Sequence, residues 1–149
     1  MPRICIFPRV ESLGGVTSFR LKFEQGLRAR GVDVTHDLHE LSDAVLVLAG
    51  TKNLYPLWLA RKRGQRIVQR LDGLNWAHRA RWTGLRYTTR AIYGNWNLSF
   101  IRNYLADRVI YQSQFVEGWW QAWYGAAAIP TSVILNGVDL EQYSPAGAH

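Results

Sequence analysis

The chain has 149 residues, of which 48% are hydrophobic and 19% charged, so it is long enough for one domain with a core and its composition excludes a disordered protein. A single cysteine, Cys5, excludes an internal disulfide, and no apolar run approaches the length of a membrane span. The net charge of +7, with 15 arginines among 18 basic residues, favours partners that carry phosphate, carboxylate or an anionic surface.

Strands and helices alternate in the first half of the chain. Residues 3–7 are a short apolar run that ends at Pro8, which predicts a buried strand. In residues 16–30, Val16, Phe19, Phe23 and Leu27 fall on one helical face, which predicts an amphipathic helix. Gly31 is a natural end for that helix. The pattern continues with two strands and a short helix, at residues 32–37, 43–50 and 53–63.

The second half continues the alternation with strands at 66–73, 107–112 and 131–137 and a helix at 113–125. The long segment between the first two of these strands, residues 74–106, predicts two helices broken near Gly94. Strands that alternate with helices at these lengths indicate βαβ units and a parallel sheet. We therefore expect an α/β fold: a doubly wound, Rossmann-like parallel sheet of about six strands with flanking helices.

A ligand of such a sheet binds beyond the carboxyl ends of the strands, where Gly14 and Gly15 precede a helix. Paired glycines let a ligand approach the backbone, and the free N–H groups of a helix N-terminus favour an anion. Arg9 is a nearby candidate for a further anion contact. A plain glycine turn is an equally good interpretation. The sequence contains neither G-x-G-x-x-G nor G-x-x-x-x-G-K-[ST], which argues against a dehydrogenase-type dinucleotide site and a P-loop.

Asp72 sits at the carboxyl edge of the predicted strand 66–73, on the same edge of the sheet as the two glycines. Its carboxylate could accept hydrogen bonds from sugar hydroxyls or act as a base, although an Asx-turn or a helix cap is the more common role of Asp before Gly. Arg70 lies two residues earlier on the same strand face, where it could pair with Asp72 or hold a phosphate. Asn75 and Asn136 also belong to this edge.

Other candidates are weaker. His36 and His39 suggest a metal site, but no further ligand pair has suitable spacing, so we expect no metal. Ser113 could contact a ligand, although a helix N-cap is the favoured interpretation. No arrangement typical of a nucleophilic hydrolase is present.

The segment from residue 74 to residue 106 is both basic and aromatic. Arg79, Arg86 and Arg90 are predicted to form one helical stripe, interleaved with Trp76, Trp82, Tyr87, Tyr93, Trp96 and Tyr104. Such a surface could rest on an anionic bilayer or stack single-stranded bases. A solvated basic face whose aromatic side chains pack on the sheet is as good an interpretation as both of these together.

Three stretches, taken in order, resemble the N-terminal half of family 4 (group 1) glycosyltransferases of the GT-B fold. They are "GGVTSF" after the first strand, "ADRVIYQSQF" around the fifth, and "VILNGVDLEQYSP" near the end. The last is the most specific, because in that family a strand followed by Asn-Gly-Val-Asp and then Tyr-x-Pro marks the junction between two Rossmann-like domains. Here these positions are Asn136, Gly137, Val138, Asp139, Tyr143 and Pro145.

The resemblance implies that this domain binds mainly the acceptor, while a C-terminal domain binds most of the nucleotide-sugar. Transfer then takes place in the cleft between the domains without a metal or cofactor, with the nucleotide-sugar as co-substrate. It further implies that Gly14, Gly15 and Val16 face donor phosphate or acceptor. Asp72 occupies a position where the family often carries histidine or an acid, which makes it the candidate catalytic residue. The family's E-x7-E segment is absent from this sequence.

We therefore expect residues 1–138 to form the N-terminal domain and residues 139–149 to begin a linker, with the donor-binding domain missing from these 149 residues. The expected substrates are a nucleotide-sugar and a hydroxyl acceptor, either a sugar or a lipid-linked one. Arg9, Arg70, Asn75, Ser113 and Asn136 are the candidate substrate contacts beside the glycine loop.

Two alternatives stay open: a non-catalytic acceptor or membrane-docking subunit that pairs with a separate donor domain, and, less favoured, a nucleic-acid-binding module. We expect no nucleic acid as partner. The absence of a signal peptide pattern predicts a cytoplasmic location, and the Arg/Trp helices of residues 78–105 are compatible with the inner face of a membrane.

Overall fold

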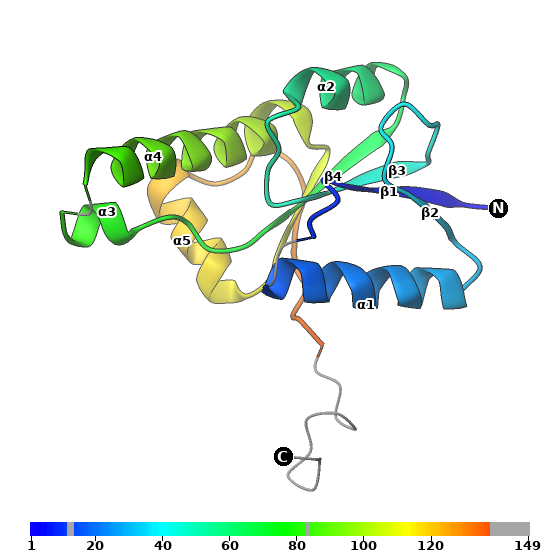
Figure 1. The fold of residues 1–149 in the computed structure, drawn as a ribbon, viewed down its shortest axis with the longest axis horizontal. Helices are drawn as coiled ribbons and strands as arrows, with labels where there is room; N and C mark the ends of the chain where they lie inside the picture. The colour runs from blue at the N-terminus through cyan, green and yellow to red at the C-terminus, as the bar shows by residue number, and fades with distance from the viewer. Residues whose placement is uncertain (12–13, 83, 138–149) are drawn as a thin grey trace, which may run out of the picture.

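A computed structural model describes residues 1–11, 14–82 and 84–137. The strands are β1 (Arg3–Phe7), β2 (Asp33–Thr35), β3 (Ala44–Leu48), β4 (Arg66–Leu71), β5 (Arg108–Tyr111) and β6 (Thr131–Val133). The helices are α1 (Gly15–Ala29), α2 (Leu54–Lys62), α3 (Ala77–Ala80), α4 (Leu85–Phe100), the π-helix η1 (Ile101–Leu105) and α5 (Gln114–Tyr124). Figure 1 shows the sheet between α1 on one side and α2 and α4 on the other.

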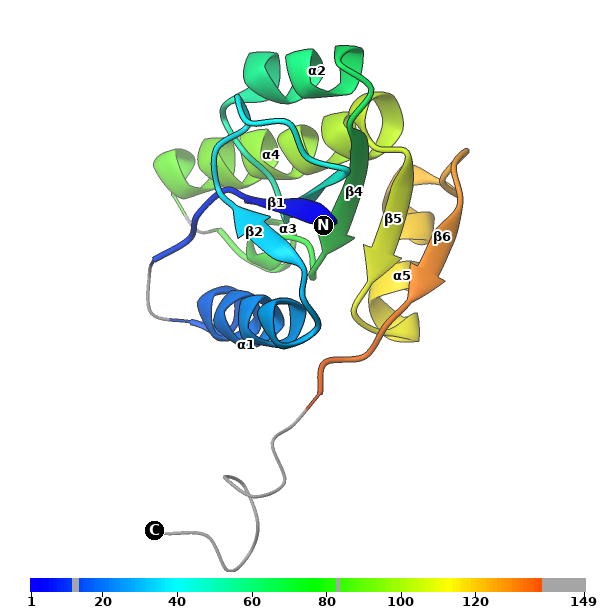
Figure 2. The same cartoon turned by 90° about the vertical axis from the view of Figure 1, so that its right-hand side faces the viewer.

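The six strands form one parallel sheet in the order β2-β1-β3-β4-β5-β6. The chain moves toward one edge from β1 to β2 and toward the other from β3 to β6. Right-handed crossovers therefore place α1 on one face, and α2, η1 and α5 on the opposite face. The predicted doubly wound, Rossmann-like α/β fold is confirmed. Figure 2 looks onto the sheet and shows no helix in front of β5 and β6.

The core alternates between the two faces of the sheet, as the pleat of a strand requires. On the α1 face, Ile6 and Leu46 pack against the apolar stripe of α1, which confirms the prediction for Val16, Phe19, Phe23 and Leu27. Gly31 has a φ of 73°, which confirms its role in ending that helix.

On the other face, Cys5 is fully buried in a cluster with residues of α2 and η1. Burial, followed by the charges of Asp37 and Glu40, raises the pKa of the Cys5 thiol to about 12. The thiol therefore stays protonated at neutral pH, which excludes Cys5 as a nucleophile.

Several strands are shorter than the sequence predicts, and β6 shows the reason. It ends at Val133 and not at Gly137, because its partner β5 ends at Tyr111. The Ile134 amide donates the last ladder bond, to the Tyr111 carbonyl at 2.9 Å. The apolar residues that follow have no neighbouring strand with which to pair.

The prediction of a helix break near Gly94 is wrong. Gly94 lies inside α4, and the break falls between α3 and α4 at Gly84, whose φ is 86°. The glycine at position 94 serves close packing, because a Cβ there would lie 3.2 Å from Asn75 Nδ2. The predicted stripe of Arg79, Arg86 and Arg90 is also wrong, since Arg79 belongs to α3 and stacks 3.9 Å from the ring centroid of Trp123.

The π-helix η1 turns Arg102 into the core between β5 and α5, where its side chain is fully buried. Its Nε donates to Tyr111 Oη at 3.0 Å, and its Nη2 donates to the Gly125 carbonyl at 2.7 Å, at the end of α5. The guanidinium lies 5.8 Å from the ring centroid of Trp120. Within the described residues it has no carboxylate partner, so neutral acceptors alone compensate its burial.

None of the helices in the described part of the chain combines the length and apolarity needed to cross a lipid bilayer.

Candidate functional site

The carboxyl ends of the strands carry two groups of polar residues, one on each face of the sheet. The first group lies on the α1 face and centres on Arg70, which is buried at the end of β4 and stacks 3.9 Å from the ring centroid of Phe19. Its Nη1 donates to Asp72 Oδ1 at 2.7 Å, and its Nη2 donates to Asn136 Oδ1 at 2.5 Å. Arg70 thus joins the end of β4 to the segment that follows β6.

Gln112 completes this group, although the sequence did not identify it. Its Oε1 accepts from Asn136 Nδ2 at 3.2 Å and from Arg70 Nη2 at 3.4 Å. Gln112 could have been predicted from its position directly after β5, at the edge of the sheet where ligands bind. Because protein oxygens engage both terminal nitrogens of Arg70, the structure gives this residue a clear positioning role, and its contact with an anion stays a prediction.

Asp72 keeps one carboxylate oxygen available. Oδ1 is paired with Arg70, whereas Oδ2 has no hydrogen-bond partner among the described residues. The side chain is 28% exposed, and the backbone carbonyl accepts from Trp120 Nε1 at 3.0 Å. The carboxylate is therefore held in place by Arg70 and can still accept a hydrogen bond from a hydroxyl group.

The glycine loop lies before α1 on the same face. Gly14 has a φ of 155°, and a Cβ at either glycine would meet nothing within 4 Å, so the space around the loop is open. No side chain caps the start of α1. Arg9 is exposed and pairs with Glu11 at 3.0 Å, while Val16 packs partly into the core.

Arg20, which the sequence did not single out, supports the loop that leads to these glycines. It is buried on α1 and donates from Nε to the Val10 carbonyl at 3.0 Å. Its Nη1 pairs with Glu24 at 2.6 Å, and Glu24 in turn faces His36 Nε2 at 3.2 Å. The sequence could not reveal that Arg20 is buried, because an arginine in an amphipathic helix is expected on the solvent-exposed face.

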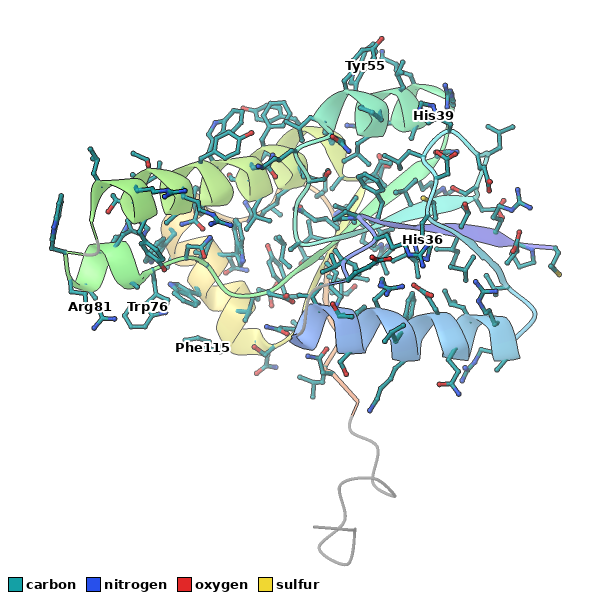
Figure 3. All side chains as sticks on the ribbon, in the orientation of Figure 1. His36, His39, Tyr55, Trp76, Arg81 and Phe115 are labelled. Carbon is teal, nitrogen blue, oxygen red and sulfur yellow. The ribbon has the colours of Figure 1, made fainter. Side chains whose placement is uncertain are left out.

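The two histidines do not converge on a metal. His36 Nδ1 lies 2.8 Å from the Ile6 carbonyl, and Figure 3 shows His36 beside the sheet and His39 near the end of α2. The described residues contain no group of three potential metal ligands. Ser113 Oγ accepts from the Val116 amide at 3.2 Å, which confirms the N-cap interpretation.

The second polar group lines a cavity of about 520 Å³ on the opposite face, between α4 and the loops that follow β3 and β4. Its walls contain two cations, three amide or hydroxyl side chains and two tyrosines, with no carboxylate among them. The lining residues are Gly50, Thr51, Lys52, Asn75, Tyr87, Arg90, Ala91, Tyr93, Gly94, Asn97 and Leu98. Of these only Asn75 was a predicted site residue. Gly50, Thr51 and Lys52 follow β3 at the same edge of the sheet, and the lining residues of α4 depend on where that helix packs.

The cavity walls are fixed by buried amides. Asn97 Nδ2 donates to the Thr51 carbonyl at 2.9 Å, and the amide of Gln69 donates to the Ala49 carbonyl at 2.8 Å and to the Leu98 carbonyl at 3.2 Å. Ala49 has a φ of 59°, a conformation that a residue with a side chain rarely adopts. The loop after β3 is therefore held against α4 at the expense of local backbone strain.

Asn75 is anchored at the opposite side of this cavity. Its backbone amide donates to Asn95 Oδ1 at 3.0 Å, and Asn95 Nδ2 donates back to the Asn75 carbonyl at 2.9 Å. The exchange fixes the loop after β4 to α4. The Asn75 side chain lines the cavity, and its Nδ2 also donates to Asn95 Oδ1 at 3.3 Å.

Exposed aromatic side chains cover the outer surface of α2 and α4. Tyr93, Trp96, Phe100 and Tyr104 form a continuous ladder on α4 and η1, with centroid distances of 6.0, 5.4 and 5.1 Å. Tyr55 and Trp58 stack on α2 at 5.9 Å, and Figure 3 shows Tyr55 pointing away from the sheet. The interpretation that the aromatic residues of segment 74–106 pack on the sheet is therefore wrong for Tyr93, Trp96 and Tyr104, each at least 50% exposed.

The chain matches the model of one protein family, Glycosyltransferase Family 4, over residues 3–142. Among solved structures it is similar to an alpha-glucosyltransferase in complex with UDP and a 13-mer DNA containing a HMU base, with 17% sequence identity and a TM-score of 0.45. That similarity covers 87% of this chain and 41% of the length of the other. No curated protein matches the chain.

Proposed function

Because the chain belongs to glycosyltransferase family 4, we propose that it forms the acceptor-side half of an enzyme that moves a sugar from a nucleotide-sugar to a hydroxyl group. The cavity beneath α4 is the observation that carries this proposal. It opens at the carboxyl edge of a parallel sheet, where ligands of such folds bind, and its amide and tyrosine side chains suit a hydroxylated ligand.

The polar residues on the α1 face would contact the parts of the two substrates that react. Gly14, Gly15 and Val16 would offer backbone N–H groups to donor phosphate, and Asp72 would accept a hydrogen bond from the acceptor hydroxyl through its available oxygen. Arg70 would keep that carboxylate oriented. Preorganised hydrogen-bond donors of this kind stabilise the negative charge of a departing diphosphate. Such electrostatic stabilisation is usually the largest contribution to catalysis.

In this proposal residues 1–138 are the acceptor domain, and residues 139–149, which lie outside the described residues together with Val138, begin a linker. A second domain would hold most of the donor. We expect the 149-residue chain by itself to bind nucleotide-sugars weakly and to transfer little, because a single helix N-terminus contributes at most about 2 kcal/mol to anion binding.

Assays with labelled nucleotide-sugars and a panel of hydroxyl acceptors would test this, with the chain alone and with a family 4 donor-binding domain joined after residue 149. Transfer is expected with the joined protein only. Robust turnover by the chain alone would contradict the need for a second domain. Absence of transfer by a joined protein that binds the donor would contradict the proposed function.

The aromatic ladder supports a second role, docking on an anionic membrane surface. Exposed tryptophan and tyrosine side chains favour the headgroup region of a bilayer, and nearby arginine and lysine side chains favour anionic lipids. Lys62, whose amine lies 5.4 Å from the Trp58 ring centroid, places such a charge beside the α2 aromatic pair.

The double substitution Trp96→Ser and Tyr104→Ser is expected to reduce sedimentation with phosphatidylglycerol-containing vesicles several-fold, because it removes the two most exposed rings of the ladder on α4 and η1 that do not line the cavity. Phe115→Ser, which removes an aromatic ring of similar exposure from α5, is the matched control and should sediment like the unmodified chain. Equal loss in both variants, or no loss in either, would count against docking through the ladder.

A further inference from the structure

Charge is distributed unevenly along the chain. Residues 44–106, which form β3, α2, β4, α3, α4 and η1, contain eleven basic residues and a single acidic one, Asp72. That carboxylate is already paired with Arg70 at 2.7 Å. The segment that forms the walls of the cavity therefore carries far more positive charge than its single acidic residue offsets.

Two of these cations, Lys52 and Arg90, line the cavity, and neither makes a hydrogen bond or an ion pair with another described residue. Two cations elsewhere in the fold are paired with carboxylates, Arg61 with Asp107 at 3.5 Å and Arg20 with Glu24 at 2.6 Å. A cavity with two available cations and no carboxylate attracts an anion, since like charges that converge without a counter-ion are unfavourable.

The positions of the two cations are set by the buried amides that fix the cavity walls. Lys52 follows Thr51, whose carbonyl is bonded to Asn97 and whose hydroxyl accepts from the Asn53 amide at 3.0 Å. Arg90 lies on α4, two turns before Asn97. The loop and the helix are thus joined to each other directly, so little ordering is needed when a ligand binds between them.

The cavity is distinct from the glycine loop. The cavity lies between α4 and the strand ends, whereas Gly14 and Gly15 begin α1, and Figure 1 shows α1 and α4 on opposite sides of the sheet. The diphosphate of a donor at the glycine loop would therefore not occupy the cavity. An anion beneath α4 would belong to the other substrate.

We propose that the acceptor of this enzyme carries a phosphate group, which Lys52 and Arg90 bind in the cavity while Asn75 contacts its hydroxyl groups. The inference rests on the proposed function, since it identifies the cavity ligand as the acceptor. Phosphate suits the pair because a guanidinium offers several donors in a plane and an ammonium adds a compact charge. The phosphate could be that of a soluble sugar phosphate or that of a lipid headgroup.

Binding of glucose 6-phosphate, glucose, and phosphatidic acid in phosphatidylcholine vesicles to the 149-residue chain tests the proposal. The double variant Lys52→Gln and Arg90→Gln is expected to weaken phosphate binding at least tenfold. The matched control, Arg63→Gln and Arg66→Gln, removes the same net charge from exposed positions outside the cavity and should bind like the unmodified chain. Circular dichroism and thermal unfolding would verify that both variants are folded.

Binding of glucose 6-phosphate that the cavity variant loses and the control keeps would support a soluble phosphate. The same dependence for phosphatidic acid vesicles, without binding of glucose 6-phosphate, would support a lipid phosphate. Glucose that binds as well as its phosphate, equal losses in both variants, or no binding of either phosphate would overturn the inference.

The transfer assay separates this inference from the proposed function. If a joined protein with the cavity substitutions transfers sugar to a neutral hydroxyl acceptor at an unchanged rate, the inference fails and the proposed function stands. If phosphate binds in the cavity but no acceptor receives sugar from a bound donor, the proposed function fails, and with it the identification of the cavity ligand as an acceptor.

Discussion

Replacement of Arg102 by methionine is expected to lower the free energy of unfolding by roughly 3–5 kcal/mol. Methionine is long enough to fill part of the space but offers no donor. The Gly125 carbonyl and the Tyr111 hydroxyl, 2.7 and 3.0 Å from the guanidinium in the native chain, would then lose their partner inside the core. The end of α5 and the π-helix η1 would both lose the residue that joins them.

Urea denaturation followed by tryptophan fluorescence would measure the loss. Arg108→Met is the matched control: Arg108 is an exposed residue of β5 whose Nη1 donates to Ser132 Oγ at 3.3 Å, and its removal should change stability by no more than about 0.5 kcal/mol. A loss below about 1 kcal/mol for Arg102→Met would show that the buried hydrogen bonds of the guanidinium are offset by its desolvation.

Gly50→Ala is expected to reduce binding in the cavity at least tenfold and to destabilise the chain by about 1–3 kcal/mol. A Cβ at this position would lie 2.6 Å from Asn97 Oδ1 and 2.8 Å from Leu98 Cδ2. Asn97 cannot move away without releasing the Thr51 carbonyl, so the loop that carries Lys52 must separate from α4. The added methyl group thus acts on both the shape of the cavity and the position of its cation.

Gly118→Ala is the control for this substitution. Gly118 lies inside α5, where an added Cβ meets nothing within 4 Å. Alanine there should stabilise the chain by about 0.5–1 kcal/mol because it restricts the unfolded backbone. Titration with glucose 6-phosphate and urea denaturation would compare the variants. A Gly50→Ala protein with native stability and undiminished binding would disprove the tight fit between the loop and α4.

The fold was predictable because hydrophobic periodicity reports directly on burial. Residues 3–7 read as a buried strand and residues 16–30 as an amphipathic helix, and both are present almost to the residue. The structural role of a glycine, by contrast, could not be predicted reliably from the sequence. Gly31 ends a helix as predicted, whereas Gly94 serves close packing inside α4, and nothing in a single sequence separates these two uses.

Contacts in the candidate site were predictable only between residues that are close together in the sequence. The pairing of Arg70, near the end of β4, with Asp72, directly after it, follows from their spacing of two residues. By contrast, Lys52 and Arg90 are far apart in the sequence and meet at one cavity only because α4 packs on the loop after β3. Nothing in the sequence predicts the burial of Arg102, since a buried arginine and a solvated one have the same sequence signature.

The guanidinium of Arg70 also connects two segments that are distant in the sequence. One of its terminal nitrogens bonds Asp72 and the other bonds Asn136, beyond the last strand. A displacement of the backbone after β6 would therefore reach the Asp72 carboxylate through two hydrogen bonds and a rigid planar group. The position of Asn136 and the orientation of the candidate catalytic carboxylate are, in this geometry, mechanically coupled.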